Sequence, residues 1–202
     1  MKLGKSWINF DLNFVELEEK NTVKLKENDS FSVSTIPLKH RIYTNGFLFT
    51  EKNIKKKIKI EKIEKLNIDK SLYNNISLGK DVILDDGTRI LNKDLTYPLK
   101  KDIVYSYCSD TSYSKDIIPL IEGSDLLYHE STFLEKHLEL AKKTKHSTAV
   151  QAAKIAKKAN CKKLLLGHFS SRYKNLEDFK LEAETIFDNV ELAKDGKEFD
   201  IL

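Results

Sequence analysis

Cysteine, proline and glycine are all scarce in this chain, with 2, 3 and 7 copies among 202 residues. Cys108 and Cys161 lie far apart and lack the close spacing of metal-binding cysteines, which excludes a paired-cysteine metal site. No apolar run is long enough to span a bilayer and no signal peptide is recognisable. We therefore expect a reducing, cytoplasmic location and no membrane partner.

The composition is that of a folded protein. Hydrophobic residues make up 40% of the chain, enough for a substantial core, so we expect one globular domain or a large piece of one. Lys and Arg number 35 against 31 Asp and Glu, giving a net charge of +4. This mild basic excess is compatible with a nucleic-acid partner but does not require one.

The first half of the chain is dominated by strand patterns. β-Branched and aromatic residues predict an antiparallel meander, with strands over 13–19, 22–26, 31–38 and 41–49. Residues 52–70 then change character, since isoleucines and leucines are embedded among many lysines. A hairpin is predicted over 81–91, with Asp86-Gly87 at its turn.

After residue 101 the pattern becomes an alternation of strands and helices, which is typical of a parallel sheet. The expected strands cover 103–107, 125–130 and 163–169, and the expected helices cover 115–121, a segment after 133, 148–159 and 176–187. Thr148 and Gln151 stand in capping-box positions, which places the start of their helix just after Ser147. Two short strands are expected around Asp195-Gly196.

Polar residues follow three of the apolar strands. Asp110 comes after the first strand, His129 and Glu130 end the second, and His168 ends the third. Strand ends are where α/β folds form their sites, because a rigid sheet holds the loops there. Each residue alone is more often a turn, a cap or a hydrogen-bonded core edge. Four such residues in one chain favour a site.

Two further histidines have suggestive positions. His40 follows a predicted strand, and His146 precedes the capped helix, whose N-terminus favours a neutral imidazole and attracts anions such as phosphate. His137 lies in a charged amphipathic segment and is expected at the surface. Arg172 and Tyr173 follow His168 and either reach phosphate and stack on a base, or simply pack at the surface.

Six segments together resemble the C-terminal two-thirds of ribonuclease Z, the transfer-RNA 3′-processing endoribonuclease of the metallo-β-lactamase superfamily. They are PLKHRIYTNGFLFTEK, LDDGTRI, SYCSDT, DLLYHESTF, KHSTAVQAAKIAKKA and LLLGHFSSRY. The resemblance implies an α/β fold, namely the C-terminal portion of the αββα metallo-β-lactamase sandwich. Residues 1–202 would form this partial domain, and 52–95 an inserted, lysine-rich exosite arm.

The resemblance also assigns roles to residues. It implies that His40, Asp110 and His168 bind two zinc ions, with Asp110 shared between them, and that Glu130 and His146 form a proton-relay pair. Such a site would hydrolyse precursor transfer RNA and remove its 3′ trailer, and the family's members are expected to be homodimers. His and Asp are suitable zinc ligands, and a shared carboxylate is typical of two-metal phosphodiesterases.

The family's HxHxDH box, which supplies further zinc ligands and a general base, does not occur in this sequence. By comparison with the family, roughly the first hundred residues are expected to be missing. The remaining ligand positions cannot close two zinc sites, so we expect weak zinc binding and poor cleavage by this chain alone. Two alternatives stay open: a catalytically inactive RNA-binding fragment, and a hydrolase of small phosphodiesters on the same fold.

The lysine-rich segment falls where the family carries an arm that grips transfer RNA. Lys55, Lys56, Lys57 and Lys59 are therefore candidates for contacting phosphates without reading bases. The alternative is an ordinary solvated surface, since Glu51, Glu61 and Glu64 are interspersed among the lysines.

Overall fold

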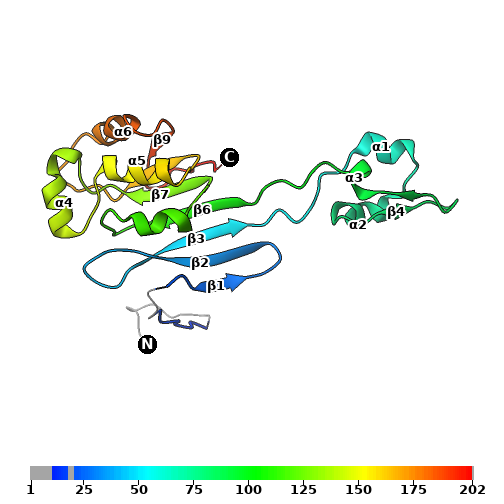
Figure 1. Cartoon of the computed structure of the whole chain (residues 1–202), viewed down its shortest axis with the longest axis horizontal. Coiled ribbons are helices and arrows are strands. Elements are labelled where there is room, and N and C mark those ends of the chain that lie inside the picture. The colour runs from blue at the N-terminus through cyan, green and yellow to red at the C-terminus, as the bar shows by residue number, and fades with distance from the viewer. Residues whose placement is uncertain (1–10, 18–20, 202) are drawn as a thin grey trace.

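The computed structural model describes residues 11–17 and 21–201, which form a mixed seven-stranded sheet, several helices and a projecting arm (Figure 1). The sheet has the strand order β1-β2-β3-β6-β7-β8-β9. Its strands are β1 Lys24–Glu27, β2 Phe31–Pro37, β3 Asn45–Glu51, β6 Ile103–Cys108, β7 Leu126–Glu130, β8 Leu164–Gly167 and β9 Val190–Leu192. Strands β1 to β3 and β6 pair antiparallel, whereas β6 to β9 pair parallel.

This topology confirms the antiparallel meander over β1 to β3 and the parallel unit after residue 101. Two strand predictions differ from the structure. Residues 13–17 form no strand, and the rest of that predicted segment lies outside the described residues. The expected strand after Asp195-Gly196 is absent from residues 197–201, where the Asp200 carbonyl instead accepts a hydrogen bond from the Lys163 ammonium.

The helical segments after β6 connect the parallel strands. They are η2 Lys115–Leu120, η3 Glu135–His137, α4 Leu138–Thr144, α5 Ala149–Lys158 and α6 Glu177–Glu184. The predicted capping box is present: the Thr148 hydroxyl accepts from Gln151 N, and the Gln151 side chain accepts from Thr148 N. It fixes the start of α5, and therefore also the position of the residues just before it. None of the helices among the described residues is long and apolar enough to cross a membrane.

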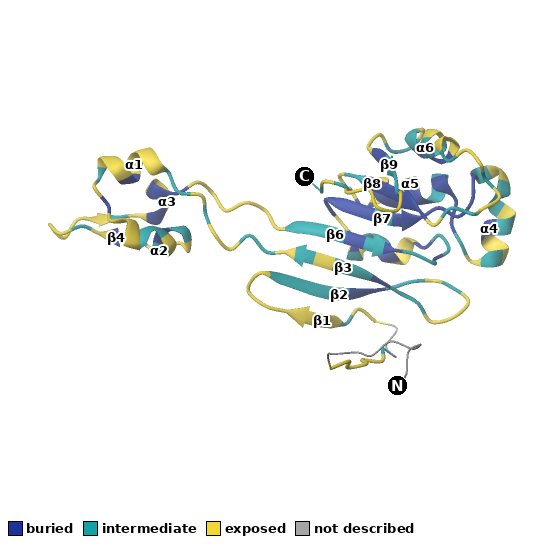
Figure 2. Cartoon of the chain, turned by 180° about the vertical axis from the view of Figure 1, so that it is seen from behind, coloured by how far each residue is buried: buried dark blue, intermediate teal, exposed yellow. Residues whose placement is uncertain are grey.

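The main core lies between the sheet and α5, with η2 and α6 beside it (Figure 2). Helix α5 presents small residues to the sheet, and Ala152, Ala153 and Ala156 are completely buried. Small side chains allow the helix to approach closely the buried leucines of the central strands. Leu127 and Leu166 on β7 and β8 form the sheet side of this core.

The opposite face of the same strands is aromatic. Phe47, Phe49, Tyr105, Tyr107 and Tyr128 alternate with the core residues, and two pairs of their rings stack across neighbouring strands. The ring centroids lie 5.7 Å apart for Phe49 and Tyr105 and 4.7 Å apart for Tyr107 and Tyr128. All five side chains stay partly or largely exposed. The described residues therefore leave this face uncovered.

The arm leaves the sheet at Glu51 and returns at Ile103, and these two residues pair in the sheet. Figure 1 shows it as a small folded unit on two extended connections. Its elements are α1 Ile60–Lys65, η1 Lys70–Leu72, α2 Tyr73–Ser77, β4 Val82–Ile83, β5 Arg89–Ile90 and α3 Asn92–Leu95. Strands β4 and β5 confirm the predicted hairpin. The arm has its own core, built from Ile63, Ile68, Ile76, Val82 and Leu95.

Candidate metal centre

Three parallel strands bring polar side chains to one edge of the sheet. Asp110 follows β6, Glu130 ends β7 beside Gly167, and His168 follows β8. Gly167 is required there, because a Cβ would collide with the Tyr128 side chain. Asp110 and His168 both have left-handed backbones, with φ of 54° and 59°. Such angles are costly for non-glycine residues and cluster at functional sites.

Glu130 is the polar hub of this edge. Its carboxylate is completely buried and accepts hydrogen bonds from the backbone N–H of Thr111 (2.8 Å), Thr132 (3.3 Å) and Ser147 (3.0 Å). The hydroxyl of Thr132 donates to Oε2 at 2.7 Å. Burial alone would raise the pKa of Glu130, but the hydrogen bonds from His146, Thr132 and Ser147 hold it below its ordinary value. Glu130 is therefore an ionised carboxylate.

His146 is oriented by this carboxylate. Its Nδ1–H donates to Glu130 Oε1 at 2.7 Å, and the ring is only partly exposed. Hydrogen bonding to Glu130 raises the pKa of His146, against the opposing effect of burial. The Glu130–His146 pair thus favours a protonated imidazole, as a proton donor requires.

His168 is connected to the same hub through Thr132. The Thr132 Oγ1 lies 2.8 Å from His168 Nδ1 and 2.7 Å from Glu130 Oε2. On the other side of the ring, His168 Nε2 lies 3.4 Å from Asp110 Oδ1. The two residues that follow β6 and β8 therefore face each other, as expected from the sequence.

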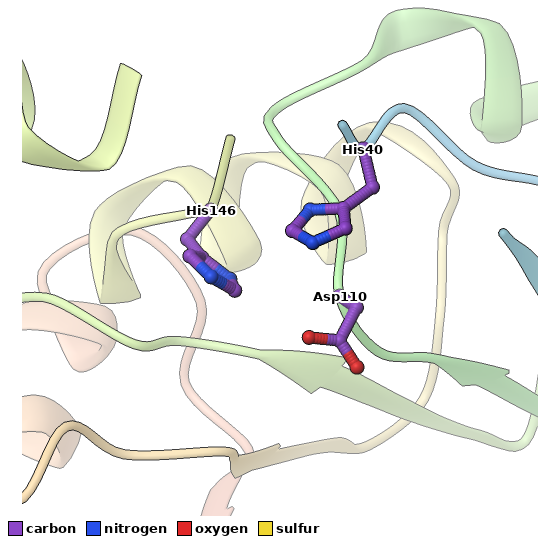
Figure 3. Close-up of side chains that lie close together, drawn as sticks. All are labelled: His40, Asp110 and His146. Carbon is purple, nitrogen blue, oxygen red and sulfur yellow. The ribbon is translucent and has the colours of Figure 1, made fainter. Parts of the chain in front are cut away.

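His40 completes the cluster from the loop after β2. Its Nδ1–H donates to the Lys145 carbonyl at 2.9 Å, which ties this loop to the segment before α5. The rings of His40 and His146 are 5.0 Å apart, and those of His146 and His168 are 5.3 Å apart. Figure 3 shows His40, Asp110 and His146 converging from three segments that are distant in sequence.

The donor atoms are spaced for metal binding. One group consists of His40, Asp110 and His146, and a second consists of Glu130, His146 and His168; within each group the ligand atoms lie within 4.8 Å of one another. Imidazole nitrogen and carboxylate oxygen are ligands that zinc accepts. The residues present therefore fit a metal centre.

Two of the predicted histidine positions differ from expectation in detail. His129 and Glu130 are neighbours in β7 and so point to opposite faces of the sheet. His129 is completely buried in the helix-covered core, where its Nδ1–H donates to the Glu130 carbonyl and its Nε2 has no hydrogen-bond partner among the described residues. His137, expected at the surface, is partly buried because its Nδ1 contacts the Tyr173 hydroxyl at 2.5 Å. Neither residue reaches the cluster.

The residues after His168 have mixed placements. Tyr173 turns inward, where its hydroxyl accepts from Leu134 N at 3.1 Å and its ring packs on Phe179. Arg172 is exposed, with its guanidinium 5.3 Å from the centre of the Phe133 ring. Of this pair, only Arg172 presents its polar group to solvent.

The four candidate lysines do not share one environment. Lys55 and Lys57 are exposed, whereas the Lys56 ammonium donates to Oδ1 of the buried Asn92 at 2.9 Å. The ammonium groups of Lys57 and Lys59 lie 6.0 and 5.5 Å from the centre of the exposed Tyr97 ring. The Lys59 ammonium also donates to the Lys93 carbonyl at 3.2 Å. Lys56 and Lys59 are therefore partly buried and bonded within the arm, whereas Lys55 and Lys57 are exposed.

Sequence reasoning missed several residues that build the site. Thr111 and Ser147 supply backbone donors to Glu130, Lys145 supplies the carbonyl for His40, and Thr132 bridges Glu130 and His168. Three of these contacts use backbone atoms, which leave no side-chain signal. Thr132 did leave one, since a threonine two residues after a buried carboxylate is well placed to bond to it.

Comparison with known proteins finds relatives that match nearly the whole length of this chain. The chain is 43% identical to a ribonuclease Z of Cytophaga hutchinsonii, over 98% of its own length and 64% of that relative. No family model matches the chain. Among solved structures, a metallo-β-lactamase fold protein of Bacillus subtilis has a TM-score of 0.56 at 19% identity, covering 87% of this chain and 51% of that one. The short form of human tRNase Z has a TM-score of 0.52 at 22% identity, covering 91% and 48%. These likenesses show the metallo-β-lactamase fold.

Proposed function

We propose, from the membership of this chain in the ribonuclease Z family, that it carries the proton-handling residues and part of the metal site of an endoribonuclease. The proposed reaction is hydrolysis of the phosphodiester that joins the 3′ trailer to precursor transfer RNA. The chain spans about two thirds or less of the length of its curated relatives, 64% in the Cytophaga protein. The observation that carries the proposal is the convergence of His40, Asp110, His146 and His168 around the buried Glu130.

The proposed proton donor is His146. In its protonated form it would give its Nε2 proton to the ribose 3′ oxygen as that oxygen leaves, while Nδ1–H stays bonded to Glu130. The Glu130 carboxylate holds the ring in place and stabilises its positive charge, and backbone donors keep the carboxylate ionised. The two residues thus act as one unit.

His40, Asp110 and His168 are the proposed zinc ligands. Bound zinc would polarise the phosphate and lower the pKa of a bound water. Two four-coordinate ions need about eight ligand positions, counting water and shared groups. The donor groups that cluster among the described residues fall short of that number. We therefore predict weak zinc binding by this chain alone.

The arm is the proposed substrate grip. Lys55, Lys57 and Lys59 would neutralise phosphates of transfer RNA, and Arg172 would do so at the rim of the metal centre. Lys56 and Lys59 are weaker candidates than Lys55 and Lys57, since their ammonium groups are engaged with Asn92 and with the Lys93 carbonyl.

We further propose a cytoplasmic homodimer. The arm starts at the Ile103 end of β6, while Asp110 lies beyond the other end of that strand. The arm therefore points away from its own metal centre (Figure 1). In a dimer the arm of one subunit would hold the RNA that the other subunit cleaves. Sedimentation at several concentrations tests for the dimer, and a monomer at all of them would contradict this arrangement.

The test of the function is a binding and cleavage assay on precursor transfer RNA with a labelled 3′ trailer. We expect salt-dependent binding and, with added zinc, slow cleavage at the trailer junction. Asp110→Asn should remove the cleavage and leave the binding unchanged, because the arm is distant from the metal centre. Lys24→Ala is the matched control, since Lys24 lies at the surface and pairs there with Glu27.

A second candidate function is RNA binding without catalysis, which the shortage of metal donors favours. Binding that persists while zinc produces no cleavage would select it. Hydrolysis of bis(p-nitrophenyl) phosphate without binding of transfer RNA would select the third possibility, a small-phosphodiester hydrolase. Absence of both RNA binding and phosphodiester hydrolysis would refute all three.

A further inference from the structure

Thr132 occupies a position between the two working parts of the site. Its side chain is buried, with 7% of the residue exposed, and its Oγ1 contacts both Glu130 Oε2 (2.7 Å) and His168 Nδ1 (2.8 Å). Glu130 belongs to the proposed proton relay, whereas His168 is a proposed zinc ligand. One hydroxyl group therefore joins the relay to the metal side.

The protons of this chain of contacts can be counted. Glu130 is ionised and can only accept, so the single hydroxyl proton of Thr132 is donated to it. The oxygen of Thr132 must then accept from His168, which requires the proton of the neutral imidazole to be on Nδ1. The lone pair is consequently on Nε2, the atom that lies 3.4 Å from Asp110 Oδ1.

We infer that Thr132 is a positioning residue that holds His168 in its Nδ1–H tautomer and aims the Nε2 lone pair at the metal centre. This inference rests on the proposed function only in regarding His168 as a metal ligand. The hydrogen bond between Thr132 and His168 exists without any metal. Partners of this kind fix the ring orientation and the tautomer of metal-binding histidines, and their loss typically costs 10–100-fold in metal affinity.

His40 provides an internal comparison. Its Nδ1–H donates to a backbone carbonyl, which can only accept, so its tautomer is fixed regardless of other groups. The hydroxyl of Thr132 can both donate and accept, and its direction is set by the charge of Glu130. Glu130→Gln would therefore disturb the tautomer of His168, although the hydrogen bonds of the described residues connect Glu130 and His168 only through Thr132.

The first test measures the ring nitrogens of His168 in the ¹⁵N-labelled, metal-free chain by NMR, at a pH where the imidazoles are neutral. His168→Gln assigns the resonances. We expect a pyrrole-type Nδ1 and a pyridine-type Nε2 in the unaltered chain. The reverse pattern in that chain would overturn the inference, and this measurement requires no destabilised variant.

The second test compares two variants of Thr132. Thr132→Val removes the hydroxyl with little change in shape, and Thr132→Ser keeps it. We expect Val to populate the Nε2–H tautomer and to weaken zinc binding by about 10–100-fold in competition with a chromophoric chelator, whereas Ser should behave as the unaltered chain does. Equal tautomers in the Val variant and the unaltered chain would refute the role of Thr132. Failure of RNA cleavage would not refute this role, because neither the tautomer measurement nor the zinc titration involves RNA.

Discussion

The left-handed backbones of Asp110 and His168 lead to a prediction about stability: glycine should be more stable than alanine at these positions, and less stable than alanine at a nearby position with an ordinary backbone. A non-glycine residue in this conformation costs about 1–2 kcal/mol. Glycine avoids that cost but makes the unfolded chain more flexible, which offsets about 0.4–1 kcal/mol. His168→Gly should therefore be more stable than His168→Ala by about 1 kcal/mol. Both variants lose the contact with Thr132, so this loss cancels in the comparison.

The assay is the free energy of unfolding from urea titration of the metal-free variants, followed by circular dichroism. Ser170, two residues further on, is the matched control, because its φ is not positive. There we expect the opposite order, with Ser170→Gly less stable than Ser170→Ala by about 0.4–1 kcal/mol. Asp110→Gly and Asp110→Ala should follow the order predicted for His168. If alanine is as stable as glycine at position 168, the backbone there is not strained and the reasoning fails.

The remaining predictions concern the hub, the arm and a buried thiol. Glu130→Ala should lower the free energy of unfolding by about 3–5 kcal/mol in urea titration, because it removes the buried partner of His146 and leaves several backbone N–H donors without their acceptor. Lys57→Ala should flatten the slope of log affinity for transfer RNA against log salt by about 0.7–0.9, whereas Lys56→Ala should not. Burial raises the pKa of Cys161 to about 12, so at pH 8 the thiol stays protonated and should react with iodoacetamide only after unfolding in urea.

Each of these has a result that would contradict it. A loss below about 1 kcal/mol for Glu130→Ala would mean that the hub is not structural. Equal slopes for the Lys56 and Lys57 variants would assign the arm lysines to an ordinary solvated surface. Rapid alkylation of native Cys161 would show that the thiol is accessible.

The sequence predicts the strand ends well because local signals determine them. The capping box fixes α5 and thereby His146, and the alternation of strands and helices predicts the parallel unit that aligns Asp110, Glu130 and His168. Within β7, successive side chains point to opposite faces of the sheet, which places His129 on the face opposite to Glu130. Register alone decides which of two adjacent polar residues enters a core.

Tertiary contacts account for what could not be predicted. The inward turn of His137 depends on Tyr173, which is 36 residues away, and the tie between His40 and Lys145 spans 105 residues. No local propensity reports on such contacts. The environment of Lys56 likewise depends on Asn92, which joins two parts of the arm. Composition marks the lysine-rich segment but does not distinguish the lysines that are bonded within the arm from the exposed ones.

The three clustered histidines share one arrangement that explains why the site is formed before any ligand arrives. His40, His146 and His168 each use Nδ1 toward the protein, with a carbonyl, a carboxylate and a hydroxyl as their respective partners. Each ring is therefore oriented by the fold through its Nδ1, which leaves Nε2 as the nitrogen that could bind a metal or give up a proton. The carboxylate of Glu130 bonds to His146 directly and to His168 through the Thr132 hydroxyl, so a change in its charge would alter both the proposed proton donor and a proposed zinc ligand. On the proposed function, proton transfer and metal binding would thus be coupled through one buried residue.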